Sequence, residues 1–382
     1  MSGLRRRGAL ALATLCGSLV VAQQARADNG MYPNFGMDYS AVLQNDFSRI
    51  DGSNPGGPRD TNDFYPDVTT SFYLRFTQND QLRLTTEFNP INPPNQGDKR
   101  VFDDVGMVVN ELNYYGLRSR TSWMIGKFEV PFGRAKDQAP GLYTNDFVAA
   151  YDMQGMLGAT LGYRMFSQTL GLIEPDISLY TADTTDLGKP FFQGGSRLKR
   201  SDGGPANSGN LDSYALALNW TGIPKLPFLE LQGGYMRNRK GVAQGDGTTP
   251  DDEVVKVVSA RYMYARAPAI NLDSTLAGRY WDIVPFIEYA DIDNEDAIAG
   301  NDTRYLTTSL TFDYGPWAIG ATRTDKRRPL IADAGRNDYL NELSVTYNVT
   351  GRLSVGFSAG TQKQAGQKAN LIGLQMTYTG AY

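Results

Sequence analysis

Five charged residues of both signs lie within one long polar segment, residues 130–154. They are Arg134, Lys136, Asp137, Asp146 and Asp152. Such side chains hold fixed charges, and beside a narrow aqueous passage those charges set a field that favours one sign of ion. A solvated surface loop of mixed charge is the alternative interpretation. The elements that flank the segment decide between the two.

A second set of charges recurs on the polar faces of alternating segments elsewhere in the chain. It comprises Arg75, Arg83, Arg164 and Arg261, together with Glu87, Glu230, Glu288 and Glu342. If these segments form a wall around water, we expect wall arginines to lie opposite Asp137, Asp146 and Asp152 of the long segment. For each single charge, an ion pair within the wall is the alternative.

The chain lacks the residues that several kinds of chemistry require. The chain of 382 residues contains no His and one Cys, which excludes Ser-His-Asp catalysis, His metal sites, Cys-rich zinc sites and an internal disulfide. The acidic run Asp291–Asp296 lacks the glycine spacing of an EF-hand, and we interpret it as a solvated loop. No dinucleotide or phosphate-loop fingerprint occurs. We therefore expect no metal, no cofactor and no enzymatic activity.

The residues around these charges alternate with a period of two. Leu306, Leu310 and Phe312 alternate with Thr307, Ser309 and Asp313, and the pattern recurs along the chain. Successive side chains of a strand point to opposite faces, so each segment has one apolar and one polar face.

Sixteen such segments can be counted, and most have the length of a tilted membrane strand. They span residues 35–47, 65–77, 81–89, 104–117, 119–129, 155–166, 170–181, 211–221, 227–238, 254–266, 281–291, 304–314, 316–325, 338–349, 352–361 and 370–382. The phase of the alternation is ambiguous near Asn110 and across Pro175.

The connections between the segments alternate between short and long. Short turns occur at 78–80, 167–169, 315–316 and 350–351, whereas long polar loops occupy 90–103, 130–154, 182–210, 239–253, 292–303, 326–337 and 362–369. The connection 267–280 is longer than this rule predicts. An even number of strands with all long loops at one end is typical of an outer-membrane barrel. Closure leaves no strand edge unsatisfied in lipid.

The first 27 residues have the three parts of a secretory signal. Arg5, Arg6 and Arg7 precede an apolar run over residues 8–22, and Ala25-Arg26-Ala27 ends in a small-x-small pattern. We predict cleavage after Ala27, which removes four arginines, no acid and the only cysteine. The formal net charge then changes from −4 to −8, which argues against binding of nucleic acid.

These observations predict an all-β fold: a 16-stranded antiparallel transmembrane β-barrel over residues 28–382, with long external loops and short periplasmic turns. The expected location is the outer membrane, in contact with its lipid.

One stretch resembles a known family. The octapeptide Gly126-Lys127-Phe128-Glu129-Val130-Pro131-Phe132-Gly133 resembles the strand-to-loop segment of the phosphate-selective porin O and P family. The similarity extends upstream through Asn110–Ile125 and downstream to Gly155–Tyr163. It implies a 16-stranded barrel, a homotrimer and a loop folded into the lumen. Phosphate-type pores of this family carry a run of arginines and a lysine cluster, whereas the wall charges listed above are balanced in sign.

The resulting hypothesis is a porin, a passive channel for small hydrophilic solutes and ions, with the 130–154 loop and the wall arginines at its constriction. A pore specific for phosphate or sugar is one alternative, and a structural or adhesive barrel is another. We expect a weak preference for cations, set by the loop aspartates.

Overall fold

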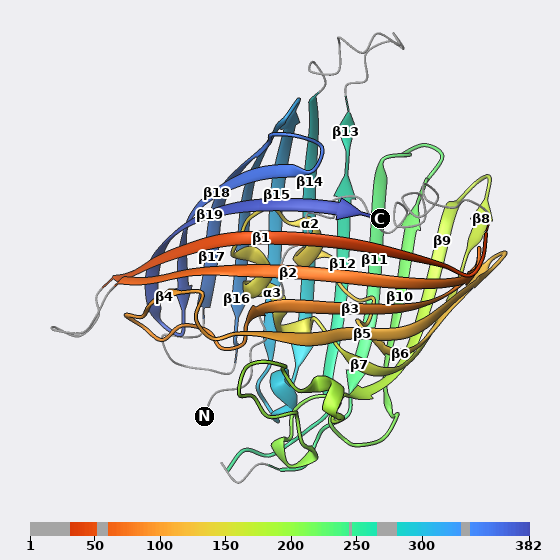
Figure 1. The fold of residues 1–382 in the computed structure, drawn as a ribbon, viewed down its shortest axis with the longest axis horizontal. Coiled ribbons are helices and arrows are strands. Elements are labelled where there is room, and N and C mark those ends of the chain that lie inside the picture. Colours follow the sequence, from red (N-terminus) through yellow and green to blue (C-terminus); the bar gives the residue numbers. More distant parts are fainter. Residues whose placement is uncertain (1–30, 52–59, 244–246, 266–280, 330–336) are drawn as a thin grey trace.

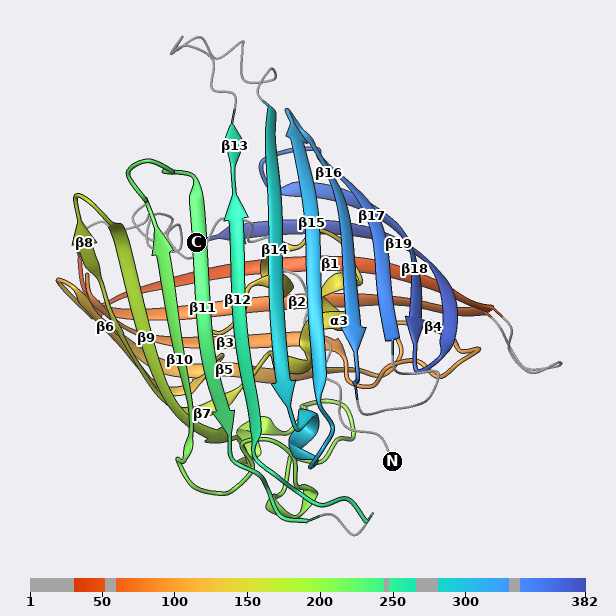
Figure 2. The ribbon, with the colours of Figure 1, turned by 180° about the vertical axis from the view of Figure 1, so that it is seen from behind.

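The computed structural model describes residues 31–51, 60–243, 247–265, 281–329 and 337–382, which form a closed antiparallel β-barrel (Figures 1 and 2). The predicted signal segment 1–27 and its cleavage site lie outside the described residues. Among the helices in these ranges, none is long and apolar enough to cross a membrane.

Within the described ranges there are nineteen strands, of which three are short: β4 (Lys99–Val101), β8 (Met165–Ser167) and β13 (Tyr264–Ala265). The other sixteen build the wall: β1 (Asn34–Asp51), β2 (Asp60–Thr77), β3 (Asp80–Pro90), β5 (Val105–Arg118), β6 (Thr121–Phe128), β7 (Met156–Tyr163), β9 (Gly171–Ala182), β10 (Ser213–Thr221), β11 (Leu229–Asn238), β12 (Glu253–Tyr262), β14 (Trp281–Asp293), β15 (Thr303–Tyr314), β16 (Trp317–Arg327), β17 (Asn337–Asn348), β18 (Leu353–Gln364) and β19 (Gln367–Ala381). Every one of the sixteen predicted segments coincides with a wall strand.

The helices are short and lie in the connections. They are α2 (Ala135–Gln138), α3 (Thr144–Val148), and the 3₁₀ helices η2 (Ala149–Tyr151), η3 (Asp186–Gly188), η4 (Arg200–Asp202) and η6 (Glu295–Ala297). The first three of these belong to the 130–154 segment.

The barrel is closed by pairing between its first and last strands. Each wall strand pairs antiparallel with its neighbour in sequence, and β1 pairs with both β2 and β19, from Asp38 opposite Ala381 to Asp51 opposite Lys368. Closure leaves no open strand edge, which confirms the predicted architecture.

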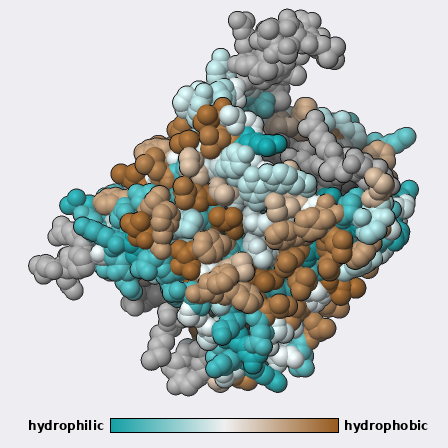
Figure 3. Space-filling model, in the orientation of Figure 1, coloured by the Kyte–Doolittle hydropathy of each residue, from teal (hydrophilic) through white to brown (hydrophobic). Residues whose placement is uncertain are grey.

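The period-two pattern separates the two faces of the wall. In β15, Tyr305 and Thr307 are buried on the inner side, whereas Leu306 and Leu310 are exposed outside. Leu218 and Phe357 are also exposed on the outer face, as their phase predicts. Figure 3 shows apolar side chains gathered in patches over the wall. Such an outer band suits contact with lipid.

The ambiguous phase near Asn110 has a structural cause. Thr85 of β3 pairs with Glu111 and Thr86 pairs with Val109, so Asn110 is an extra residue in β5. This β-bulge shifts the alternation by one residue, which explains why the sequence pattern breaks there. Pro175, in contrast, keeps the regular register of β9, opposite Leu218.

Aromatic pairs mark the end of the barrel where the short turns lie. Tyr39 stacks near Tyr382, and Trp317 packs on Tyr347, with ring centroids 6.2 and 4.6 Å apart. Aromatic side chains of this kind form a girdle at the membrane–water interface in outer-membrane barrels.

One predicted long loop is wrong. Strands β18 and β19 extend beyond their predicted ends, and only Ala365 and Gly366 connect them, in place of a loop over 362–369. Both residues have positive φ angles, 50° and 83°. A two-residue hairpin turn with left-handed central residues matches the twist of the two strands it joins. The polar residues at 362–369 therefore belong mostly to the ends of these strands, and their polarity did not indicate a long loop. The predicted connection 267–280 lies outside the described residues.

Candidate pore site

The 130–154 loop folds into the barrel and contacts the inner side of the wall. Figures 1 and 2 place α2 and α3 between β1–β5 on one side of the barrel and β14–β17 on the other. The hydroxyl of Thr322 in β16 donates to the carbonyl oxygen of Pro140 at 2.6 Å. The loop therefore crosses the lumen. This excludes the alternative interpretation that it is a solvated surface loop.

Glu288 of β14 holds the beginning and the end of the loop. Its carboxylate accepts the backbone N–H groups of Arg134 at 2.6 Å and Ala135 at 3.0 Å, and the hydroxyl of Tyr151 at 2.7 Å. The Glu288 side chain is 1% exposed. Hydrogen bonds to a buried charged acceptor are among the stronger ones in proteins, so this contact fixes the loop firmly.

Glu342 of β17 holds the middle of the loop in the same manner. It accepts the backbone N–H groups of Leu142 at 2.5 Å and Tyr143 at 3.1 Å, and the hydroxyl of Thr144 at 2.9 Å. Ser358 of β18 donates to it from the wall. We call Glu288 and Glu342 the latch glutamates.

Two glycines on the inner face allow the loop to approach the wall. A Cβ atom on Gly320 would lie 2.5 Å from Pro140, and one on Gly373 would lie 2.8 Å from Leu142 and Tyr143. Real Cβ atoms do not approach other heavy atoms this closely, because the repulsion is too strong. The absence of side chains at these positions is part of how the sequence seats the loop.

Lys136 of the loop lies among three acids: Asp137 and Asp152 of the loop, and Glu129 just before it. Lys136 donates to Asp152 at 2.5 Å and to Glu129 at 3.3 Å. Burial opposes the ammonium charge, but Asp152 and Glu129 outweigh it and raise the pKa of Lys136. Burial and Glu129 raise the pKa of Asp152 to about 8, and burial and Glu129 also raise that of Asp137.

Arg134 lies on another side of the loop and meets the wall. Its guanidinium contacts Glu230 of β11 at 3.2 Å and donates to Asn219 of β10 at 2.7 Å. Arg261 of β12 contacts the same Glu230 at 3.4 Å. Burial lowers the pKa of Arg134, although Glu230 partly offsets this. Loop and wall charges are thus brought together here through a shared carboxylate.

The remaining wall arginines have partners within the wall. Arg83 pairs with Glu111 at 3.0 Å, and Arg164 pairs with Glu174 at 2.8 Å. The guanidinium of Arg75 lies over the ring of Tyr73, 5.4 Å from its centroid. The described contacts of these arginines are therefore with wall residues, which is the alternative that the sequence left open for each of them.

Three acids near the loop were missing from the predicted site: Asp67, Glu111 and Glu129. Asp67 lies on the inner face of β2 and interacts electrostatically with Glu87 and with the loop residue Asp146. Its phase, which it shares with Tyr65, Thr69 and Ser71, could have revealed it. Glu111 was hidden by the bulge beside it, because the phase of β5 changes at Asn110.

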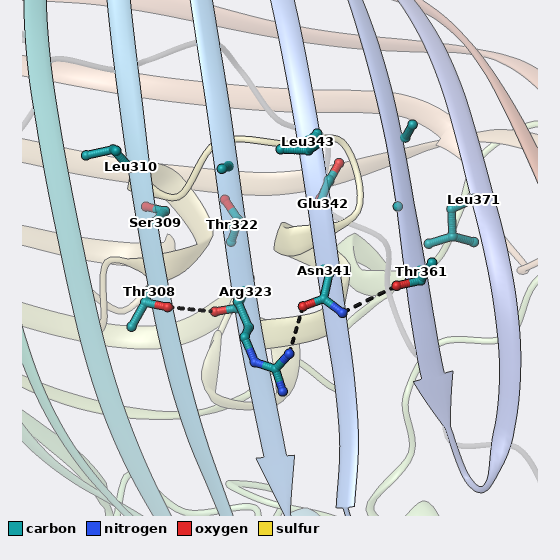
Figure 4. A pocket seen from close by; sticks show the side chains of 13 residues that line it. Thr308, Ser309, Leu310, Thr322, Arg323, Asn341, Glu342, Leu343, Thr361 and Leu371 are labelled. Atoms are coloured by element: carbon teal, nitrogen blue, oxygen red, sulfur yellow. Dashed lines mark hydrogen bonds between the residues drawn. The ribbon is translucent and has the colours of Figure 1, made fainter.

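A groove of about 710 Å³ lies elsewhere, along β15–β19 (Figure 4). Arg323 donates to Asn341 at 2.9 Å, and Asn341 donates to Thr361 at 3.3 Å. Leu310 and Leu343, which also line it, are exposed on the outer face, so this row of polar side chains is separate from the lumen. The described residues contain no group of three or more acids, His or Cys arranged to hold a metal.

Fold and lumen together define the class: a closed antiparallel β-barrel with sixteen wall strands and one loop folded into it, the architecture of outer-membrane barrels. Solved structures of that type are similar over nearly the whole chain. OprB of Pseudomonas putida matches with a TM-score of 0.59 and 12% identity, covering 91% of this chain and 94% of that one. The outer-membrane channel DcaP of Acinetobacter baumannii matches with 0.53 and 10%, covering 91% and 98%.

OpdL of Pseudomonas aeruginosa matches with a TM-score of 0.51 and 12% identity, covering 91% of this chain and 99% of that one. No protein-family model matches the sequence, and no curated protein is significantly similar to it. At these identities the likeness establishes the fold, and the lumen residues must carry the functional argument.

Proposed function

We propose that the protein is an outer-membrane porin, a passive diffusion channel for small hydrophilic solutes and ions. The observation that carries the proposal is the charged loop held across the lumen of a closed barrel by Glu288 and Glu342. A wide barrel leaves an aqueous channel, and an inward loop narrows it. No chemical step and no cofactor is part of this function.

Single-channel recording tests it. Protein extracted from outer membranes and added to a planar bilayer should insert in discrete conductance steps that scale with salt concentration. A structural or adhesive barrel, used only through its external loops, should produce no steps.

We place the constriction at the 130–154 loop, with Arg134, Lys136, Asp137, Asp146 and Asp152 facing the wall. Glu129 and Asp137 outnumber Lys136 on one side of the loop, and Asp152 adds a further negative charge above about pH 8. Glu87 lies among the acids near Asp146. Excess negative charge at a narrowing attracts cations and repels anions. We therefore expect a weak cation preference, measured as the reversal potential under a salt gradient.

A phosphate-selective pore is the second candidate, favoured by the resemblance of residues 126–133. Its support in the lumen is the pair Arg134 and Arg261, which share one acid, Glu230. Strong anion selectivity, with conductance that saturates in phosphate, would favour it over the general porin. Sugar specificity would instead appear as block of the ion current by a sugar.

Cleavage after Ala27, location in the outer membrane and assembly as a homotrimer complete the proposal. Intact mass of the outer-membrane form tests the first, and the mass of the detergent-solubilised complex tests the third. A lipid-modified species that retains Cys16 would contradict the proposed processing.

A further inference from the structure

The outer face of the barrel carries an arginine at a depth where a neighbouring strand is apolar. In β14 the outward positions are apolar from Trp281 to Tyr289. In β16 the fourth outward position from Trp317 is Arg323, with 52% of its side chain exposed. A strand that rises about 3.3 Å per residue at a tilt of 35–45° places Arg323 about 15 Å above Trp317, inside an apolar band about 25 Å tall.

The surface is hollowed beside this arginine. The groove of about 710 Å³ in Figure 4 is lined by two small outward residues, Ala321 of β16 and Ala359 of β18, and by the exposed Leu310 and Leu343. Arg323 belongs to the hydrogen-bonded polar row that crosses the groove. Apolar walls with a polar row suit an amphipathic molecule whose hydrocarbon chains lie along the barrel.

Cations face each other toward the external end of the same strands. Arg304 of β15 pairs in register with Arg327 of β16, and Lys363 of β18 pairs in register with Lys368 of β19. All four occupy outward positions, and Arg304 also contacts Asp291 at 3.0 Å. Like charges directly opposite each other destabilise a sheet. Two such pairs on one face indicate that anionic groups bind there.

The protein itself leaves these cations incompletely paired. Within the part of the chain that the structure describes, Arg327 has no ion pair and no side-chain hydrogen bond. Lys363 donates to the backbone carbonyl oxygen of Asn337 at 3.0 Å. Asp51 of β1 lies opposite Lys368 in register, but these two described side chains form no ion pair. Donors therefore remain available at both cation pairs.

The depth and spacing of the two cation pairs match lipid headgroups. Arg327 lies ten residues from Trp317, and Lys368 lies ten residues from Tyr378. Ten residues of a tilted strand rise about 25 Å, which reaches the external edge of the apolar band. The centres of the two pairs are three strand spacings apart, roughly 14 Å. That separation suits two anionic groups on one molecule.

We propose that the outer face of β15–β19 binds an outer-leaflet lipid that carries two phosphate groups. One phosphate lies at Arg304 and Arg327 and the other at Lys363 and Lys368, because phosphate oxygens accept strong charge-assisted hydrogen bonds from both kinds of side chain. The hydrocarbon chains lie in the groove, where Arg323 donates to their polar linkages. A second copy docked by the same face about a twofold axis would bring like charges together. This inference concerns the outer surface and goes beyond the proposed porin function.

Native mass spectrometry of the full chain in detergent tests the proposal. The probe is diphosphoryl lipid A, and monophosphoryl lipid A is its match with one phosphate fewer. The wild-type protein should bind the diphosphoryl form about fivefold more tightly, the size expected for exposed ion pairs. Arg327→Gln combined with Lys368→Gln removes one cation from each pair, and should lower the affinity for diphosphoryl lipid A about fivefold.

Arg237→Gln combined with Lys256→Gln is the matched control. These two cations also face outward, on β11 and β12, but each has an acidic partner, Asp252 and Asp293 respectively. Their loss should change the affinity less than twofold. Ala321→Leu fills the groove without a change in charge, and should weaken the binding of both lipids several-fold.

The outcomes that overturn the proposal are distinct. Equal affinity for the two lipids, or equal losses in the two double variants, overturns the phosphate positions. Unchanged lipid binding in Ala321→Leu overturns the groove as the seat of the chains, and a lower mass of the solubilised complex in that variant would assign it to a contact between copies. Conductance steps test the porin function separately, so the failure of one leaves the other standing.

Discussion

Glutamates on the inner wall have two different roles, and the difference lies in their partners. The latch glutamates, Glu288 and Glu342, are almost fully buried and accept backbone N–H groups of the loop. Glu111 and Glu230 lie on the same inner face, and arginines are their partners. We expect the first pair to fix the shape of the lumen and the second pair to tune its charge.

This comparison teaches that charge in a lumen cannot be assessed by counting inward-facing acids. A carboxylate whose oxygens are occupied by loop N–H groups is withdrawn from the passage. A carboxylate such as Glu230, with 33% of its side chain exposed, still contributes to the field that an ion meets. Variants of the two pairs should therefore affect different properties of the channel.

The largest effect is expected from Glu342→Ala. It leaves the N–H groups of Leu142 and Tyr143 and the hydroxyl of Thr144 without their acceptor, at about 1–3 kcal/mol for each buried donor. The loop should detach, so the single-channel conductance should rise and the open current should become noisy. Glu230→Ala is the control and should keep a quiet current. Equal noise in both variants would contradict the division of roles.

A smaller effect is expected when the loop aspartates are neutralised together. The triple variant Asp137→Asn, Asp146→Asn, Asp152→Asn keeps both latch glutamates, so conductance should stay near the wild-type value while cation preference falls about threefold. Replacing Arg75, Arg83, Arg164 and Arg261 should shift the reversal potential in the opposite direction. An unchanged reversal potential in the triple variant would remove the loop from the constriction.

The pH dependence of selectivity should be smaller again. The pKa of Asp152 is raised to about 8, so its carboxyl is protonated below that pH and gains a negative charge above it. Cation preference should therefore increase as the pH rises from 6 to 9, while Lys136 stays charged because its own pKa is raised. Asp152→Asn should flatten this dependence. A wild-type profile without a slope between pH 6 and 9 contradicts the assignment.

The finest test concerns access of water to the space between loop and wall. Ser358 is fully buried beneath Glu342, although its phase places it on the inner side. A water-soluble thiol reagent should therefore leave Ser358→Cys unlabelled, and should label it once Glu342→Ala is added. Leu310→Cys on the outer face should stay unlabelled in both backgrounds. Labelling of Ser358→Cys in an otherwise wild-type protein would mean that the loop is not seated there.

The sequence predicted the wall well because a membrane barrel strand is a local pattern. Alternation identified every wall strand, and even its failure at Asn110 coincided with a bulge. The hairpin at Ala365 and Gly366 was mistaken for a long loop, because polar residues occur both in loops and at the water-exposed ends of strands. Alternation also placed Glu230, Glu288 and Glu342 on the inner face.

What the inner-face residues contact was decided only by the tertiary structure. Arg134 and Glu288 are 154 positions apart, and Leu142 and Glu342 are 200 apart, so no local pattern relates them. The period of a strand specifies which face a carboxylate occupies. Whether it then holds a backbone N–H, pairs with an arginine or, like Asp67, lies buried beside other acids depends on how the closed barrel brings distant strands and one loop together.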